Sequence, residues 1–256
     1  MPDGKPSALM IGAHLDDCEA GLGGVSCRLA REGWRVVFLN TIGDVSALPA
    51  FASKERADEF HRQAVAAALL LGAEKIFLNY QHNLLHQTDP RVVSDIAGVI
   101  QRINPTLVFI PWPDDHHYDH SRTSRAAMEA LSYTNRMAAG KPVEPQLREI
   151  LAYEISSWQT RDFTPDFYLN VAPDIDTVLA AMNTFRVFNE ATLRHYTDEM
   201  RYRRQSWGVS AYYPYAEGFK HLGPEFPIRS LLPGLLAADL RPAGSLQYPW
   251  GGRYFR

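Results

Sequence analysis

Short apolar runs alternate with longer amphipathic stretches over the first half of the chain. Four runs have the length of buried strands: residues 7–11, 36–40, 75–78 and 106–110. Four helices are expected after them: from about 17 to 32, from 54 to 71, from 90 to 103 and from 121 to 131. Ser53 is suited to cap the second helix and Gly72 to end it, while Asp89-Pro90 is a typical start for the third. This alternation predicts an α/β fold with a mainly parallel sheet and helices on both faces.

The second half of the chain has a weaker pattern. Short strands are expected at 149–154 and 166–171, and helices at 174–188 and 191–207, with Gly208 ending the last one. From residue 222 onward the sequence is rich in Pro, Gly and aromatic residues and has no periodicity. We therefore expect one α/β domain over residues 1–256. Its core lies at about 7–221, and 222–256 forms a C-terminal wrap or an oligomer contact.

Composition narrows the class of protein. The 256 residues are 46% hydrophobic, which fits a globular domain with a sizeable core. A net charge of −3 indicates no general attraction to nucleic acid or to an anionic membrane. No apolar run reaches membrane-spanning length, and the N-terminus lacks a secretory pattern. Cys18 and Cys27 would lie too far apart on one helix for a disulfide. We expect a cytoplasmic protein whose partner is a small molecule.

Two of the predicted strands end in groups of ionisable side chains. His14, Asp16 and Asp17 follow the first strand, and the segment 114–120 (DDHHYDH) follows the strand at 106–110. Ligands of parallel α/β sheets bind beyond the carboxyl ends of the strands, where the strand order reverses. If these two strands are neighbours, both groups face one crevice. A lone histidine or aspartate pair here would be structural, but their joint occurrence predicts a site.

The two groups together contain a set of metal-binding side chains. His14, Asp17 and His120 make a two-histidine, one-carboxylate set, which suits Zn²⁺ and leaves a position open; Fe²⁺ and Mn²⁺ also bind such sets. Asp16, beside a ligand but free, is suited to act as a general base toward water activated by the metal. His117, if protonated, would stabilise an oxyanion, with Asp119 holding it in that state.

These residues also suggest a family. The stretch 13–24 (AHLDDCEAGLGG) resembles the AHPDD-x-E-x-G-x-GG signature of PIG-L/LmbE-like zinc-dependent N-acetylglucosaminyl deacetylases, and 117–120 (HYDH) is similar to their second motif, HPDH. Weaker matches occur at Arg56 with Glu59, at Leu71-Gly72, at Tyr153-Glu154 and at 215–219 (YAEGF), so the resemblance spans roughly residues 7–221. It implies a Rossmann-like fold and a hydrolase that removes an N-acetyl group from an N-acetylglucosamine-type conjugate.

Motif positions carry the roles of family residues over to this chain. The resemblance implies that His14, Asp17 and His120 bind Zn²⁺ and that Asp16 is the general base. It also implies that His117 assists the tetrahedral intermediate with support from Asp119. Arg56 matches a position where family members often place a substrate-binding arginine. The resemblance and the aromatic C-terminal segment also leave a homo-oligomer open.

The sequence departs from the family pattern at three positions near the motifs. Leu15 and Tyr118 replace prolines, but neither position supplies a ligand. His116 stands where bacillithiol-type enzymes often carry arginine, which argues against that substrate. Trp112, next to the second cluster, is a candidate for stacking on a sugar. His82 and His86 fall in a loop-like stretch, 79–89, and are expected at the surface or at the rim of a pocket.

Four other functions compete with the deacetylase. A metal-dependent phosphoesterase, or an amidase with a different small-molecule substrate, would use the same residue types. A non-catalytic sugar-binding module would not need Asp16 and all three proposed ligands. A dinucleotide-binding protein is disfavoured because Gly21, Gly23 and Gly24 fall inside the first helix, and Asp16 and Asp17 would repel a pyrophosphate.

Overall fold

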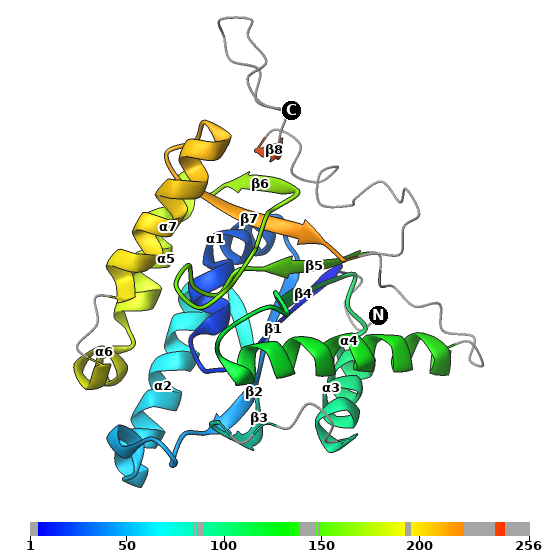
Figure 1. Ribbon diagram of the computed structural model, residues 1–256, viewed down its shortest axis with the longest axis vertical. Coiled ribbons are helices and arrows are strands. Elements are labelled where there is room, and N and C mark those ends of the chain that lie inside the picture. Colours follow the sequence, from blue (N-terminus) through cyan, green and yellow to red (C-terminus); the bar gives the residue numbers. More distant parts are fainter. Residues whose placement is uncertain are drawn as a thin grey trace, which may run out of the picture.

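A twisted sheet forms the centre of the protein (Figure 1). The computed structural model describes residues 5–83, 85, 90–138, 147, 149–192, 196–222 and 239–243. Within them lie eight strands: β1 (Ser7–Gly12), β2 (Arg35–Asp44), β3 (Ala73–Gln81), β4 (Leu107–Pro111), β5 (Glu149–Tyr153), β6 (Phe167–Asn170), β7 (Ala216–His221) and β8 (Leu240–Pro242). Their order is β3-β2-β1-β4-β5-β7-β6-β8. The first five strands pair in parallel, and β7, β6 and β8 continue the sheet with antiparallel pairings.

Helices cover both faces of this sheet, as the alternating pattern predicts. The described helices are α1 (Asp17–Arg31), α2 (Lys54–Leu70), α3 (Pro90–Ile103), α4 (Tyr118–Ala138), α5 (Ile175–Asn183), α6 (Arg186–Thr192) and α7 (Tyr196–Ala211). Figure 1 shows α3 and α4 on one side and α1, α2, α5 and α7 on the other. Side chains of the fully buried β1 alternate between two cores: Ala8 and Met10 pack on one side, and Leu9 and Ile11 on the other. The predicted α/β class is confirmed.

Several predicted boundaries differ from the structure. The helix expected at 121–131 begins at Tyr118, so the second cluster enters its first turn. The helix expected at 174–188 breaks between Asn183 and Arg186, where the Thr184 hydroxyl donates to backbone carbonyls. The last helix passes Gly208, which does not end it. A Cβ on Gly208 would lie 2.5 Å from the Tyr213 carbonyl oxygen, so this glycine permits a close backbone approach instead.

The glycines of the first motif have the same use. A Cβ on Gly21 would lie 2.3 Å from the Tyr153 ring, and one on Gly24 would lie 2.3 Å from Val171. Both glycines lie inside α1, away from any phosphate-binding turn. They let α1 pack closely against β5 and the segment after β6, which brings the start of the helix to the site.

A buried ion pair ties the second half of the fold to α1. Both oxygens of Glu217, on β7, accept hydrogen bonds from α1: Gly24 N–H and Val25 N–H, each at 2.8 Å. The guanidinium of Arg204, on α7, donates to the same carboxylate at 2.6 Å. Both side chains are almost fully buried. Their mutual neutralisation is therefore required for α7 and β7 to pack on α1.

Three remaining predictions concern the cysteines, the C-terminus and the membrane. Cys18 and Cys27 are free thiols, as expected, and Cys18 donates to the Met10 carbonyl from a buried position. Most of the predicted C-terminal wrap, 222–256, lies outside the described residues; part of it forms β8 at the sheet edge. In the part of the chain that the structure describes, no helix is long and apolar enough to cross a membrane.

Candidate metal and active site

The two polar clusters meet because β1 and β4 are neighbours. The strands pair in parallel, with Ala8 opposite Leu107. From β1 the chain builds β2 and β3 on one side, and β4 and β5 extend the sheet on the other. The carboxyl ends of β1 and β4 therefore open on one crevice at a reversal of strand order. The expectation that both clusters share a crevice is confirmed.

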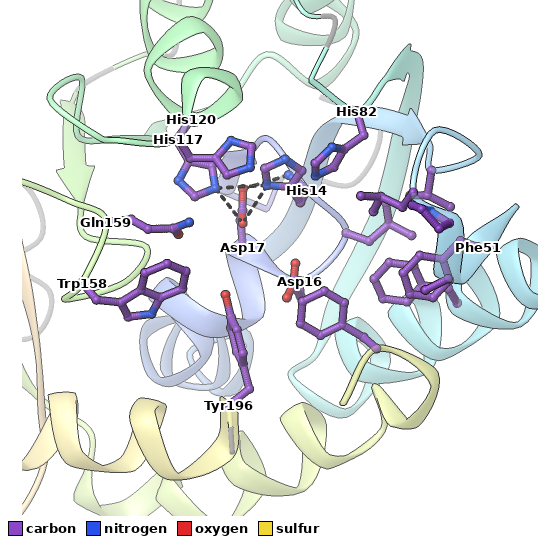
Figure 2. Close-up of a pocket in the computed structure, with 17 residues that line it drawn as sticks. His14, Asp16, Asp17, Phe51, His82, His117, His120, Trp158, Gln159 and Tyr196 are labelled. Carbon is purple, nitrogen blue, oxygen red and sulfur yellow. Dashed lines mark hydrogen bonds and ion pairs between the residues drawn. The ribbon is translucent and has the colours of Figure 1, made fainter. Parts of the chain in front are cut away.

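The three predicted metal ligands converge at this point. His14 Nδ1 lies 3.0 Å from His120 Nε2, and the Asp17 Oδ1 atom lies 3.6 Å from the first nitrogen and 3.5 Å from the second. Figure 2 shows the three side chains pointing toward one another. Imidazole nitrogen and carboxylate oxygen suit Zn²⁺ and related divalent ions, so this donor set fits the metal that the motifs imply.

Neighbouring groups hold two of these ligands in place. Asp17 Oδ2 accepts the N–H groups of Ala13 and His14 at 2.7 and 2.8 Å, so Oδ1 is left to face the imidazoles. Asp115 Oδ1 lies 3.1 Å from His120 Nδ1, the ring nitrogen away from the other ligands. Asp115 Oδ2 accepts the hydroxyl of Thr160 at 2.8 Å. A carboxylate this close to the outer nitrogen of the ring favours the orientation in which Nε2 faces the other ligands. The sequence analysis assigns Asp115 no role.

The Asp119 carboxylate lies against His14. Its Oδ2 is 3.2 Å from His14 Nε2 and accepts the Asn83 N–H at 2.7 Å. The predicted support of His117 by this carboxylate differs from the geometry. Among the described contacts, the hydrogen bond between the two residues runs from the Asp119 backbone N–H to His117 Nδ1, at 3.3 Å. Asp119 is therefore placed to orient His14.

The two aspartates of the first motif titrate in opposite directions. Burial and the neighbouring charge of Asp17 raise the pKa of Asp16 to about 6. Burial also acts to raise the pKa of Asp17, but His120 and His14 outweigh it and hold that pKa well below its usual range. The two adjacent carboxylates thus differ: Asp17 stays ionised and can bind a cation, whereas Asp16 can exchange a proton near neutral pH.

The histidines also divide into two kinds. Burial lowers the pKa of His14, but Asp17 and Asp119 outweigh it and raise that pKa to about 10. Burial and the charges of His14 and His120 lower the pKa of His117 to about 3. In the metal-free protein His117 is therefore a neutral imidazole at neutral pH. The sequence analysis gives His117 an oxyanion role only if it is protonated, and burial and the positive charge of the neighbouring histidine pair disfavour that form when no metal is bound.

A cavity of about 410 Å³ adjoins the ligands. Asp16 and His117 line it together with the three ligands. Figure 2 shows Trp158, Gln159 and Tyr196 on one side and Phe51 on the other. The wall around Phe51 is apolar, and it comprises Val45, Leu48, Pro49, Ala50, Phe51, Phe60 and Phe188. Among the described residues that line the cavity there is neither lysine nor arginine.

The structure places three of the other four residues singled out from the sequence. The Arg56 Nε donates to the Ala50 carbonyl at 2.8 Å, behind the rim, and Arg56 does not line the cavity. Trp112 donates to the Arg161 carbonyl and does not line the cavity either. The tryptophan that lines the cavity is Trp158. His82 lines the cavity, its ring centroid 4.7 Å from that of His14. His86 lies outside the described residues.

The turn that carries the first motif is fixed by a buried lysine that the sequence does not single out. Lys75, on β3, donates to the Leu15 carbonyl at 2.6 Å and to the Glu19 carboxylate at 2.5 Å. Both charged side chains are fully buried. These two hydrogen bonds hold the turn at Leu15, the position at which the family pattern has a proline.

The fold and the site together define a Rossmann-like α/β protein with a two-histidine, one-carboxylate group, able to hold a metal ion, where the strand order reverses. Residues 9–131 match the family model described as PIG-L, GlcNAc-PI de-N-acetylase. This match agrees with the PIG-L/LmbE-like resemblance that the motifs carry. A curated relative, diacetylchitobiose deacetylase of Thermococcus kodakarensis, is 28% identical over 229 residues, which cover 83% of this chain and 81% of that protein.

Solved structures agree with the fold. N,N′-diacetylchitobiose deacetylase from Pyrococcus horikoshii has a TM-score of 0.71 at 21% identity, with 89% of each chain covered. GalB, the 4-carboxy-2-hydroxymuconate hydratase from Pseudomonas putida KT2440, has a TM-score of 0.67 at 20% identity, with 86% of this chain and 98% of GalB covered. A deacetylase and a hydratase thus share this fold, so the reaction must be argued from the site.

Proposed function

We propose that the protein is a metal-dependent hydrolase that removes the acetyl group from an N-acetylglucosamine-type sugar conjugate. The observation that carries this proposal is Asp16. It lines the cavity beside the three predicted ligands, and its pKa of about 6 differs sharply from that of Asp17. A carboxylate that is ionised at neutral pH and still basic is suited to take a proton from water. The diacetylchitobiose deacetylase relative supports an N-acetyl sugar as substrate.

His14, Asp17 and His120 would hold the metal, for which Zn²⁺ is proposed and to which Fe²⁺ and Mn²⁺ are also suited. When bound, the ion would polarise the amide carbonyl and lower the pKa of a water molecule. Asp115 keeps His120 directed toward the ion, and Asp119 does the same for His14.

The side chains of the cavity supply the proton transfers. Asp16 removes a proton from the attacking water and returns it to the leaving nitrogen as the amide carbon–nitrogen bond breaks. His117 accepts the Asp119 N–H at Nδ1, so its neutral ring carries its proton on Nε2. This N–H would donate to the carbonyl oxygen as negative charge develops there. His117 thus acts as a neutral donor in this proposal, with no change of its own charge.

The cavity favours an uncharged substrate. No lysine or arginine stands among its described lining residues to pair with a phosphate or a carboxylate, which disfavours the phosphoesterase alternative. Trp158, with 48% of its surface exposed, and Tyr196 present aromatic faces on which a sugar ring can stack. Arg56 is proposed to act indirectly, by holding the rim at Ala50 through its hydrogen bond.

The proposal is tested by acetate release from N-acetylglucosamine, N,N′-diacetylchitobiose and an aryl N-acetylglucosaminide, with metal-loaded and chelated protein. Asp16→Asn should keep its metal and lose about 10²–10⁴-fold in rate. Asp58→Asn, at an exposed position on α2, is the matched control. Normal turnover of Asp16→Asn would remove Asp16 as the base. Hydrolysis of a phosphate ester or another amide without acetate release would favour the alternative hydrolases, and sugar binding without turnover would favour a binding module.

A further inference from the structure

A second group of metal-binding side chains lies next to the first and shares His14 with it. His14, His82, His117 and Asp119 each offer one ligand atom, and these atoms lie within 4.8 Å of one another. The ring centroid of His14 is 4.5 Å from that of His117 and 4.7 Å from that of His82. The centroids of His82 and His117 are 5.4 Å apart. Three imidazoles and a carboxylate thus surround one point.

The two ring nitrogens of His14 face different groups of side chains. Its Nδ1 faces His120 at 3.0 Å, within the first group, and its Nε2 faces the Asp119 carboxylate at 3.2 Å. The two groups therefore lie on opposite nitrogens of the same ring. A cation at the second group would be distinct from one held by His14, Asp17 and His120.

Two polar atoms of the second group have no partner in the described part of the chain. They are Nδ1 of His82 and Oδ1 of Asp119. Asp119 is completely buried, so its unpartnered oxygen is also shielded from solvent. Buried polar atoms in folded proteins are nearly always satisfied, and a cation held by this group would satisfy both the carboxylate oxygen and the imidazole nitrogen.

The backbone holds the second group in position. The His82 N–H donates to the Asp44 carbonyl at 3.0 Å directly after β3. Asn83 follows with a left-handed φ of 62°, and its N–H donates to Asp119 Oδ2 at 2.7 Å. On the other side, the His117 N–H donates to Asp115 Oδ1 at 2.7 Å. His82, Asn83 and His117 are thus held at the site by their backbone N–H groups, which reduces the ordering that a ligand would have to impose.

We propose that His82, His117 and Asp119, together with His14 Nε2, form a second metal position for Zn²⁺ or another divalent transition metal. Imidazole nitrogen together with carboxylate oxygen is a donor set typical of these ions. A bound ion would draw the four atoms together, since metal–nitrogen distances are about 2.0–2.1 Å. When the first position is filled, its ion engages the same imidazole through Nδ1. The second ion must then displace the Nε2 proton of His14 to solvent, so that the ring bridges the two ions as an imidazolate, and it therefore binds more weakly. If the proposed function holds, the second ion also removes His117 from the substrate, and excess metal inhibits.

The experiment counts metal ions without using substrate. Metal-free protein is titrated with Co²⁺ and Zn²⁺, and bound metal is measured by equilibrium dialysis and by the Co²⁺ visible spectrum. The wild type should bind two ions per chain, the second at least tenfold more weakly. His82→Asn should bind one and lose the spectrum of the second. His61→Asn, a histidine change on the outer part of α2, should still bind two. Saturation of the wild type at one ion, or two ions in His82→Asn with an unchanged spectrum, would overturn the second position.

A second arm separates this inference from the proposed function. Acetate release is measured against rising Zn²⁺ in the wild type and in His82→Asn. Inhibition by excess Zn²⁺ should appear in the wild type and need at least tenfold more Zn²⁺ in the variant. Two ions per chain with no acetate release would refute the proposed function and leave the second position intact. Acetate release by protein that binds a single ion would refute the second position and leave the proposed function intact.

Discussion

Metal affinity at the first position should depend strongly on pH, and the structure sets the size of the effect. Burial opposes protonation, but Asp17 and other carboxylates raise the pKa of His14 to about 10 and that of His120 to about 9. The 3.0 Å hydrogen bond between the two rings needs one donor and one acceptor, so only one ring can carry a full positive charge. Asp17 is already ionised at neutral pH. One proton therefore has to leave when the metal binds.

Because the imidazole must be neutral to bind a metal, affinity rises with pH until the pKa is passed. One displaced proton corresponds to about tenfold per pH unit, or about 100-fold between pH 6 and pH 8. Zn²⁺ affinity would be measured by competition with a chelating dye. Proton release would be measured by calorimetry at pH 7 in two buffers with different ionisation enthalpies. An affinity that stays flat from pH 6 to pH 8, with no proton released, would refute this view of the apoprotein's hydrogen bonding.

Three further predictions concern packing and ligand orientation. Gly21→Ala should destabilise the fold by about 1–3 kcal/mol in chemical denaturation, because its Cβ would clash with a tyrosine ring. Gly98→Ala, in open space on α3, should stabilise the fold by about 0.5–1 kcal/mol. Equal effects of the two substitutions would contradict the packing argument. Asp115→Asn should weaken Zn²⁺ binding about 10–100-fold, and the exposed neighbour Asp114→Asn should not; similar losses would exclude an orienting role. Glu217→Ala leaves a buried arginine unpaired and should cost about 3–5 kcal/mol of unfolding free energy, and a loss below 1 kcal/mol would be inconsistent with that burial.

The core of the site is predictable from the sequence because it depends on local signals. A buried strand that passes directly to His14 and Asp17, and a second one followed by His120, place these side chains at strand ends. Parallel pairing then brings the ends together. The class of fold follows from the alternation of strand-like and helical segments along the chain. The sequence leaves open only whether the two strands are neighbours, and the pairing of β1 with β4 supplies that part.

Other parts of the site depend on contacts between distant segments. His82 reaches the site only because β3 ends at the same edge and Asn83 adopts a left-handed turn, which no local pattern predicts. The state of His117 depends on the charges of neighbouring histidines. β7 is missed because Glu217 looks exposed in sequence, and its burial depends on an arginine from α7. The position of His82, the charge of His117 and the burial of Glu217 thus all depend on contacts between residues far apart in the sequence.

The placement of the proposed ligands has a consequence for folding. Two of them come from the first strand–helix turn, and the third comes from α4, 106 residues beyond His14 in the chain. An ion held by all three would act as a reversible cross-link that closes a long loop and ties β1 to β4 at the middle of the sheet. By mass action such a link stabilises the native state over the unfolded chain. Metal supply would then govern how long the folded protein persists, as well as whether it can react.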